Sequence, residues 1–289
     1  DHRALHSFPT RRSSDLANRI DSLYGIVNGT SNYILTRMVA DGLSFADALR
    51  EAQGRGYAEA DPTLDVGGGD SAHKLTMLGS LAFHQLIDPK LIPVSGIDGI
   101  DIRDIRNARE LGFEVKLLAV GKRTENGLDL RVHPALLPAS HPLAAVSGVF
   151  NAIYVVGDAV GEEMFYGKGA GQMPTGSAII ADLVASARGE ARQSFRSLSF
   201  LRNESPIPLL PSGESRCGYY LRLTVKDTWG VVGQIGSILG EHRVSVRSLI
   251  QHDSEASAGS SEPSATIIIL THAAKERRVL KALDLLEQL

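Results

Sequence analysis

The order of its patterned segments constrains the fold of this chain more than any other feature, because helical patterns come first and strand patterns follow. Apolar residues repeat with helical spacing in residues 31–40, 44–52 and 71–86, and glycines end the first two of these segments. Strands are predicted later in the chain, with one helix over 101–111 between the first two of them: 93–100, 114–121, 128–132, 152–156 and 162–166. This order predicts an α/β (α+β) fold in which a mixed sheet carries helices on one face.

Turn-forming residues link several of these strand segments. The pair Asn126-Gly127 is typical of a two-residue hairpin turn, and residues 157–161, with a glycine at each end, predict a second hairpin. A glycine-containing stretch then leads into a helix predicted over 174–187.

A polar, proline-containing stretch separates this first pattern from a smaller second one. Residues 188–213 contain Pro206, Pro208 and Pro211, which is typical of a linker. The order beyond it is strand, helix, strand, strand, helix, predicted over 219–225, 230–241, 244–251, 265–271 and 275–286. That order is the one of a small ferredoxin-like unit whose last strand is missing.

These patterns divide the chain into two domains. We assign residues 17–200 to the first domain, 201–213 to the linker and 214–289 to the second domain. Residues 1–16 show neither helical nor strand periodicity, so we expect a non-native or disordered tail there.

Charge and composition exclude several classes of protein. The net charge is −3, which argues against binding of nucleic acid or an anionic membrane by bulk charge. No apolar run approaches the length of a transmembrane helix, and Cys217 has no second cysteine with which to form a disulfide. The nine histidines show no metal-ligand spacing. We therefore expect a cytoplasmic protein with no metal site and with neither nucleic acid nor membrane as a partner.

The densest chemistry lies in residues 52–74, where carboxylates and one lysine are separated by glycines. Asp70 and Lys74 are four positions apart and share a face if one helix covers both. Carboxylates beside a lysine suit a substrate that carries an ammonium group, with the lysine as proton donor or positioning group. On charge alone, an exposed loop with a surface ion pair stays open as an alternative. The triplet Gly67-Gly68-Gly69 favours a site, because glycines allow close backbone approach at a cost in order.

The same stretch resembles the signature of the homoserine dehydrogenase family. The matching residues are Ala52, Gly56-Tyr57-Ala58, Asp61-Pro62, Asp65-Val66, Gly68, Asp70 and Lys74. Residues 25–35 are similar to the Asn-Gly-Thr segment that the family carries just upstream, and the resemblance extends from residue 17 to residue 289. It implies NAD(P)-dependent interconversion of L-homoserine and L-aspartate 4-semialdehyde, in the biosynthesis of threonine, methionine and isoleucine.

The resemblance also implies roles for individual residues. Lys74 occupies the position of the catalytic lysine, and Asp70 that of its supporting carboxylate. Glu59, Asp65 and Tyr57 occupy substrate-binding positions, and two acidic residues there suit the ammonium group of the substrate. Hydride addition to an aldehyde leaves an alkoxide, which a lysine ammonium can stabilise and protonate.

Two glycine-containing segments complete the predicted sites. Residues 167–171 precede a helix, and free backbone N–H groups at such a place can bind an anion, although a tight strand-to-helix turn explains the same pattern. By resemblance, Gly169, Gly171 and Thr30 contact the cofactor, NADP or NAD. The second segment resembles the opening of an ACT domain and implies threonine as an effector; its residues are Asp227, Gly230-Val231-Val232-Gly233 and Ile235.

The family also carries a dinucleotide-binding domain with a Gly-x-Gly-x-x-Gly motif, and no such pattern precedes residue 20. We therefore expect this chain to be inactive as a dehydrogenase by itself, and to form a homodimer or a higher homo-oligomer through its sheet domain. Two other functions stay open: a non-catalytic amino-acid-binding regulator, and a dehydrogenase for a related amino-acid aldehyde.

Overall fold

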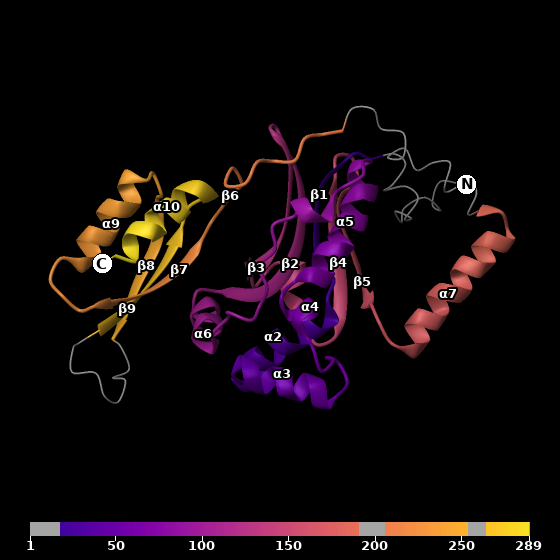
Figure 1. Cartoon of the computed structure of the whole chain (residues 1–289), viewed down its shortest axis with the longest axis horizontal. Helices are drawn as coiled ribbons and strands as arrows, with labels where there is room; N and C mark the ends of the chain where they lie inside the picture. Colours follow the sequence, from indigo (N-terminus) through magenta and orange to yellow (C-terminus); the bar gives the residue numbers. More distant parts are fainter. Residues whose placement is uncertain (1–17, 191–205, 254–263, 289) are drawn as a thin grey trace, which may run out of the picture. The chain divides into compact units, whose positions relative to one another are not determined.

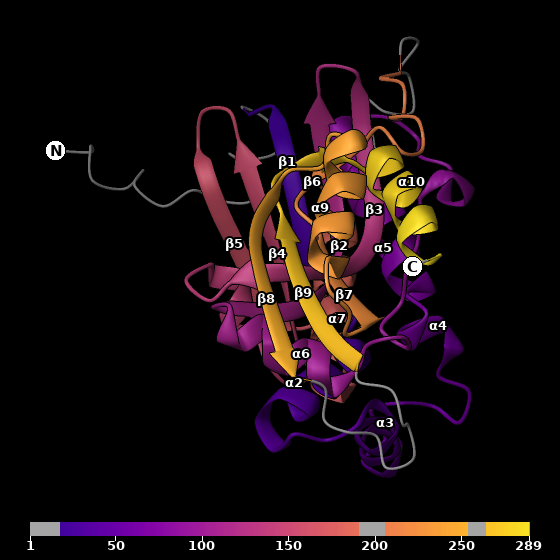
Figure 2. The same cartoon turned by 90° about the vertical axis from the view of Figure 1, so that its left-hand side faces the viewer.

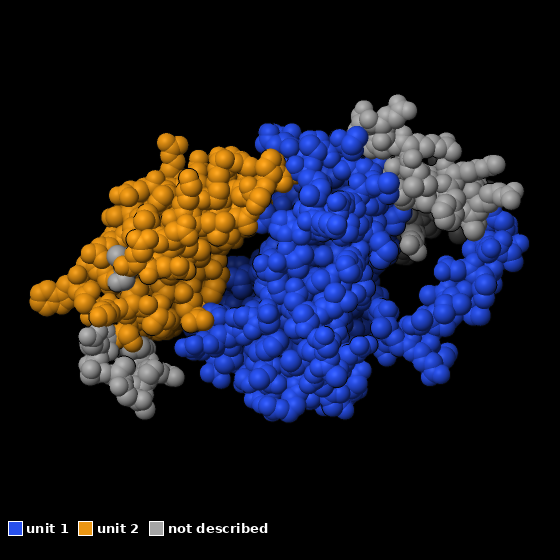
Figure 3. Space-filling model, in the orientation of Figure 1, with its two compact units in different colours: residues 1–209 blue, residues 210–289 orange. Residues whose placement is uncertain are grey.

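The computed structural model describes residues 18–190, 206–253 and 264–288, which belong to two compact units, residues 1–209 and 210–289 (Figure 3). The predicted tail and residues 201–205 of the predicted linker lie outside the described residues. Ile207 and Leu209, also assigned to the linker from the sequence, pack against the core of the first unit. Within the described ranges, no helix is long and apolar enough to cross a membrane.

The first unit is built on a five-stranded sheet of order β3-β2-β1-β4-β5 (Figure 1). The named strands pair only antiparallel, and β2–β3 and β4–β5 are the two predicted hairpins. Parallel pairing occurs only at isolated bridges of described residues, such as Val94 with Val132. The strands are β1 (Ile20–Ile26), β2 (Phe113–Thr124), β3 (Gly127–Pro138), β4 (Phe150–Gly157) and β5 (Gly161–Lys168).

Two strand predictions differ from the structure. The central strand β1 is not predicted, because it is buried on both faces and its apolar residues therefore do not alternate with polar ones. The strand predicted over 93–100 is wrong: only Val94 forms a bridge there. The segment then turns away, and the backbone N–H of Ile97 donates to the carbonyl of Val66 at 2.7 Å instead of to a strand.

Helices cover one face of this sheet, as the pattern predicts. They are α2 (Gly29–Asp41), α3 (Phe45–Gly54), α4 (Thr63–Val66), α5 (Gly69–Phe83) and α6 (Ile102–Glu110). Side chains cap three of them, Asn28 at α2, Ser44 at α3 and Asp101 at α6, whereas α4 and α5 have no side-chain cap. The helices α2, α5 and α6 contact the sheet, and their fully buried side chains form its main core: Ile34, Leu35, Met38, Leu75, Ile105 and Ala108.

The opposite face of the sheet is packed by the segment that links β3 to β4, which contains the short 3-10 helix η3 (Pro142–Ala145). Leu143 and Val146 form a small core there with Ile26 and Leu118. Other apolar side chains around this core stay partly exposed: Tyr24, Val120, Val156 and Met164. After β5 the first unit continues into α7 (Gln172–Ala187), in which no residue is buried.

The second unit has the predicted ferredoxin-like order. Its strands β7 (Tyr220–Lys226), β8 (Val246–Asp253) and β9 (Ser264–Thr271) form an antiparallel sheet of order β7-β9-β8. Helices α9 (Val231–Glu241) and α10 (Glu276–Leu286) contact each other and share one core with this sheet (Figure 2). The pair β6 (Arg216–Cys217) and β10 (Ala274–Lys275) is not predicted, because two residues are too few to show a period.

Candidate active site

Helix α5 brings the predicted lysine and its carboxylate together. Asp70 lies in the first turn of the helix and Lys74 one turn later, and Lys74 Nζ is 2.7 Å from Asp70 Oδ2. The side chains are 40% and 25% exposed, so a ligand can reach the pair. The i,i+4 contact expected from the spacing is therefore present.

The glycine triplet allows the chain to reach this geometry. Gly68, the residue just before α5, has a φ of +85° in the left-handed region, which favours glycine. A side chain at Gly67 would lie 2.6 Å from the Thr63 carbonyl oxygen, and one at Gly69 would lie 2.8 Å from Leu64 Cδ1. At Gly67 and Gly69 the backbone thus approaches residues of α4 more closely than a side chain would allow.

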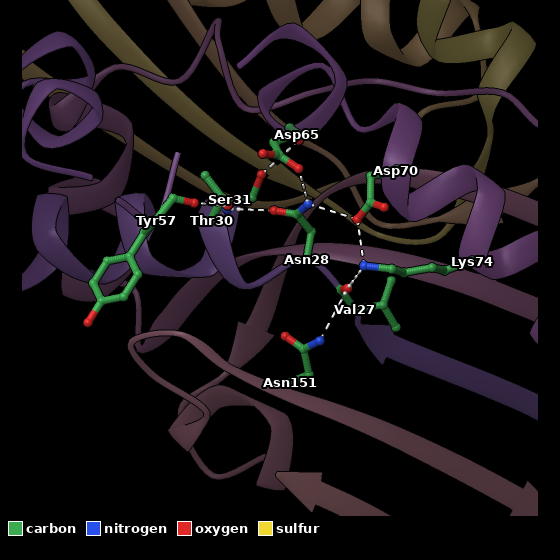
Figure 4. A network of polar contacts seen from close by, with 9 residues as sticks. All are labelled: Val27, Asn28, Thr30, Ser31, Tyr57, Asp65, Asp70, Lys74 and Asn151. Carbon is green, nitrogen blue, oxygen red and sulfur yellow. Dashed lines mark hydrogen bonds and ion pairs between the residues drawn. The ribbon is translucent and has the colours of Figure 1, made fainter. Parts of the chain in front are cut away.

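The junction of β1 and α2 supplies the other half of the site (Figure 4). Lys74 Nζ donates a hydrogen bond of 2.9 Å to the carbonyl oxygen of Val27. Asn28 Nδ2 donates to Asp65 Oδ1 at 2.7 Å and to Asp70 Oδ2 at 2.9 Å. Asn28 Oδ1 accepts from the backbone N–H of Ser31 at 2.7 Å, so one buried amide both caps α2 and bridges the two carboxylates.

This arrangement has a definite electrostatic character. Two carboxylates and one ammonium group lie around a neutral amide, so the cluster has an excess of one negative charge when all three are ionised. Asp65 is held from a second side, because Ser31 Oγ donates to its backbone carbonyl at 2.9 Å. A ligand with a positive charge and a hydrogen-bond acceptor suits such a cluster.

The other residues predicted to bind substrate lie in the segment between α3 and α4. The carbonyl of Tyr57 accepts a 2.6 Å hydrogen bond from Thr30 Oγ1, which ties this segment to the start of α2 (Figure 4). The Tyr57 side chain is 43% exposed and its ring centroid is 4.8 Å from that of Tyr33. Glu59 is exposed, and no hydrogen bond or ion pair among the described residues joins its carboxylate to the cluster of Figure 4.

The two predicted cofactor glycines lie after β5. Gly171 precedes the first turn of α7 with φ of +116°, and no side chain caps that turn. Gly169 lies against the side chain of Asn151, and a Cβ atom at position 169 would overlap that side chain.

Sequence reasoning missed two roles at this site. Asn28 belongs to the recognised Asn-Gly-Thr segment, and its place just before a helix signals a cap, but nothing local signals its bonds to two carboxylates. Asn151 lies near the start of β4, and its Nδ2 donates to the Val27 carbonyl at 3.3 Å. No sequence signal indicates this contact. No group of three His, Cys, Asp or Glu side chains within the described ranges could hold a metal ion.

Comparison with known proteins identifies two families in this chain. The model of the homoserine dehydrogenase family matches residues 8–184, and that of the ACT domain matches residues 219–289. The first match includes residues 8–16, which belong to the segment expected to be a tail. Both matches contain the motifs quoted from the sequence.

Individual relatives are similar over nearly the whole chain. A homoserine dehydrogenase of Neisseria gonorrhoeae is 44% identical over 94% of this chain and 62% of its own length, and one of Corynebacterium glutamicum is 39% identical over 96% and 62%. The crystal structure of a homoserine dehydrogenase from Thiobacillus denitrificans superposes with a TM-score of 0.88 at 41% identity, over 96% of this chain and 63% of that one. The chain thus spans less than two thirds of these relatives, and within that span it belongs to the homoserine dehydrogenase family and carries an ACT domain.

Proposed function

We propose that the protein containing this chain interconverts L-homoserine and L-aspartate 4-semialdehyde with NAD or NADP. The observation that carries the proposal is the placement of Lys74. Its Nζ is fixed by Asp70 Oδ2 at 2.7 Å and the Val27 carbonyl at 2.9 Å, while the side chain stays 40% exposed. An ammonium group has three N–H donors, so two can fix the group while the third points to a ligand oxygen.

The chemistry assigned to Lys74 follows from this placement. In the direction of reduction, the third N–H donates to the aldehyde oxygen and stabilises the negative charge that develops on it. The proton then passes from Nζ to that oxygen, which gives the alcohol. In the reverse direction, neutral Lys74 accepts the hydroxyl proton as the aldehyde forms. Asp70 keeps Nζ in place in both directions.

The amino-acid end of the substrate carries an ammonium group, which we assign to Asp65 and Glu59, with Tyr57 beside them. Asn28 occupies Oδ1 of Asp65, and the second carboxylate oxygen makes no hydrogen bond with another described residue. That oxygen is therefore available to a substrate ammonium group. Glu59 is exposed on the neighbouring segment, and in this proposal its carboxylate binds the same substrate ammonium group.

The nicotinamide cofactor supplies or takes up the hydride when it is bound. The start of α7 fits a polar part of such a molecule, because its first-turn N–H groups have no side-chain cap and Gly171 brings the backbone to the surface. We assign Gly169, Gly171 and Thr30 to this contact.

We assign two further partners to the protein. The partly exposed apolar side chains on the sheet face opposite the helices fit a second copy of the chain, so we propose a homodimer, which light scattering of the purified protein tests. In the ACT domain, Gly230 with φ of +88° precedes α9 and Ile235 is fully buried, so the motif forms the expected strand-turn-helix. We propose threonine as its effector; calorimetric titration with L-threonine, with L-valine as the control, tests this.

The experiment that tests the activity uses the full-length protein. Purified enzyme should reduce NAD or NADP when L-homoserine is added, and should be much slower with L-serine, which is one methylene shorter. Binding of amino acids without any cofactor reduction would instead support the non-catalytic regulator. Faster turnover of another amino-acid alcohol would support the related dehydrogenase.

A further inference from the structure

Asn151 joins three segments that meet at Lys74. It lies on β4 opposite Gly167 of β5, and its side chain extends toward the end of β1 (Figure 4). Its Nδ2 donates to the Val27 carbonyl at 3.3 Å. The same carbonyl accepts the hydrogen bond from Lys74 Nζ at 2.9 Å. The Val27 carbonyl oxygen therefore accepts a hydrogen bond from each of the two side chains.

The peptide group that carries this oxygen is next to Asn28, the residue that bridges the two carboxylates. Val27 is followed directly by Asn28, whose amide holds Asp65 and Asp70. A rotation of the peptide plane between them would move the acceptor of Lys74 and the bridge to Asp70 together. Asn151 is a side chain outside the β1–α2 segment that opposes such a rotation, and it contacts neither carboxylate.

Gly169 lies against the nitrogen of the same Asn151 amide. A Cβ atom placed at position 169 would overlap Asn151 Nδ2 and would lie 2.8 Å from its Cγ. The backbone φ of Gly169 lies outside the left-handed region, so a side chain there would be opposed by the Asn151 amide and not by the backbone conformation. The glycine segment before α7 and the Lys74 acceptor thus share one side chain.

The Asn151 amide is also poorly satisfied. Its Oδ1 is buried and has no hydrogen-bond partner among the described residues. An unpaired buried acceptor destabilises a fold by about 1–3 kcal/mol. A side chain kept at such a cost to stability is more typical of a site than of a core.

We propose that Asn151 is a positioning residue for Lys74, acting through the Val27 carbonyl, and that Gly169 sets the position of the Asn151 amide. The proposal rests on the proposed function, because it assigns Asn151 to the orientation of the group that transfers the proton. Asn151 itself touches no reacting atom in this account.

The kinetic test uses the full-length enzyme and four variants. Asn151→Leu keeps the approximate shape and removes the donor, Asn151→Ala removes the whole amide, and Gly169→Ala pushes the amide away. The double variant, Gly169→Ala with Asn151→Ala, removes both the overlap and the amide. Loss of one partly buried hydrogen bond predicts a fall in kcat of about tenfold for each variant, with KM for homoserine changed less than about twofold. The double variant should be no slower than either single change, because each disturbs the same contact.

Gly99→Ala is the matched control, because no atom lies within 4 Å of the added methyl group and its φ is ordinary. Its kcat should equal that of the wild type. Asn151→Leu with wild-type kcat would overturn the proposal, and so would single changes whose effects on kcat multiply in the double variant. If Asn151→Leu does not fold, the position of Lys74 in Gly169→Ala decides, as measured by the resonance below, because Gly169 is also assigned to the cofactor and its kcat does not separate the two roles.

A second readout needs no activity. In this chain with isotope-labelled lysine, the side-chain resonance of Lys74, identified by its loss in Lys74→Arg, should shift in Asn151→Leu and in Gly169→Ala but not in Gly99→Ala. An unmoved Lys74 resonance in both variants would contradict the proposal. A wild-type enzyme without homoserine oxidation would refute the proposed function instead, while the resonance still tests the positioning of Lys74.

Discussion

Asn28 makes a large and testable contribution to the stability of the first unit. Asn28→Ala removes the cap of α2, which contributes about 1 kcal/mol. It also removes hydrogen bonds of 2.7 and 2.9 Å to two carboxylates, each worth about 1.5–3 kcal/mol when the site is dry. Asp70 is 25% exposed, so water replaces part of that loss. We expect the free energy of unfolding to fall by about 3 kcal/mol.

Urea unfolding of this chain measures the effect. Hydrogen exchange pulse-labelling at each urea concentration, read by mass spectrometry of peptides, follows the two units separately. The urea midpoint of peptides from the first unit should fall in Asn28→Ala, while that of peptides from the second unit stays unchanged. Ser44→Ala is the matched control, because Ser44 caps α3 without bridging carboxylates at the site, and it should cost only about 1 kcal/mol.

A second substitution separates the cap from the bridge. Asn28→Asp keeps an oxygen that can cap α2 but places a third carboxylate against Asp65 and Asp70. It should be at least as destabilising as Asn28→Ala at neutral pH, because three carboxylates then lie together. The bridging role would be refuted if Asn28→Ala were no more destabilising than Ser44→Ala. It would also be refuted if Asn28→Asp were as stable as the wild type.

Three further predictions concern other parts of the first unit. Burial lowers the pKa of Lys116 below its ordinary value of 10.5. As pH rises toward that value the unfolded chain binds more protons than the folded chain, so the free energy of unfolding should rise with pH. Lys116→Met should abolish this rise, measured as urea midpoints between about pH 7 and pH 10. A methyl group at Gly96 would overlap the Val66 carbonyl, so Gly96→Ala should lower the free energy of unfolding in urea by about 1–3 kcal/mol, whereas Gly99→Ala should not change it. The hydrogen bond with Glu162, together with burial, raises the pKa of Tyr154 to about 12, so Glu162→Gln should lower that pKa toward 10.0 in an NMR titration of labelled tyrosine.

Local signals explain what the sequence predicted correctly. Helix α3 begins at the cap formed by Ser44, and the spacing of Asp70 and Lys74 fixes their contact once one helix covers both. The three long strands and two helices of the second unit are predicted because each carries its own period and is bounded by turns or loops. In all these cases, the information lies within a few residues of the feature.

The rest depends on contacts between distant segments. The Val27 carbonyl that holds Lys74 lies 47 positions earlier in the chain, and Asn151 meets the same carbonyl across 124 positions. Strand β1 carries no alternation, because helices cover one of its faces and the η3 segment packs on the other. Neither packing on two faces nor a shared acceptor leaves a periodic signal in a single sequence.

The most direct test of the whole account is the turnover number of Lys74→Ala in the full-length enzyme, with homoserine varied at saturating cofactor and a thermal melt beside it. A group that stabilises charge only in the transition state lowers kcat when removed, so we predict a loss of about a hundredfold or more, without rescue by Lys74→Arg. Glu59→Asp, which shortens the carboxylate but keeps its charge, should instead raise KM. A surface ion pair predicts near-wild-type kinetics for all three variants. A folded Lys74→Ala enzyme that keeps most of its turnover would contradict the assignment of the active site.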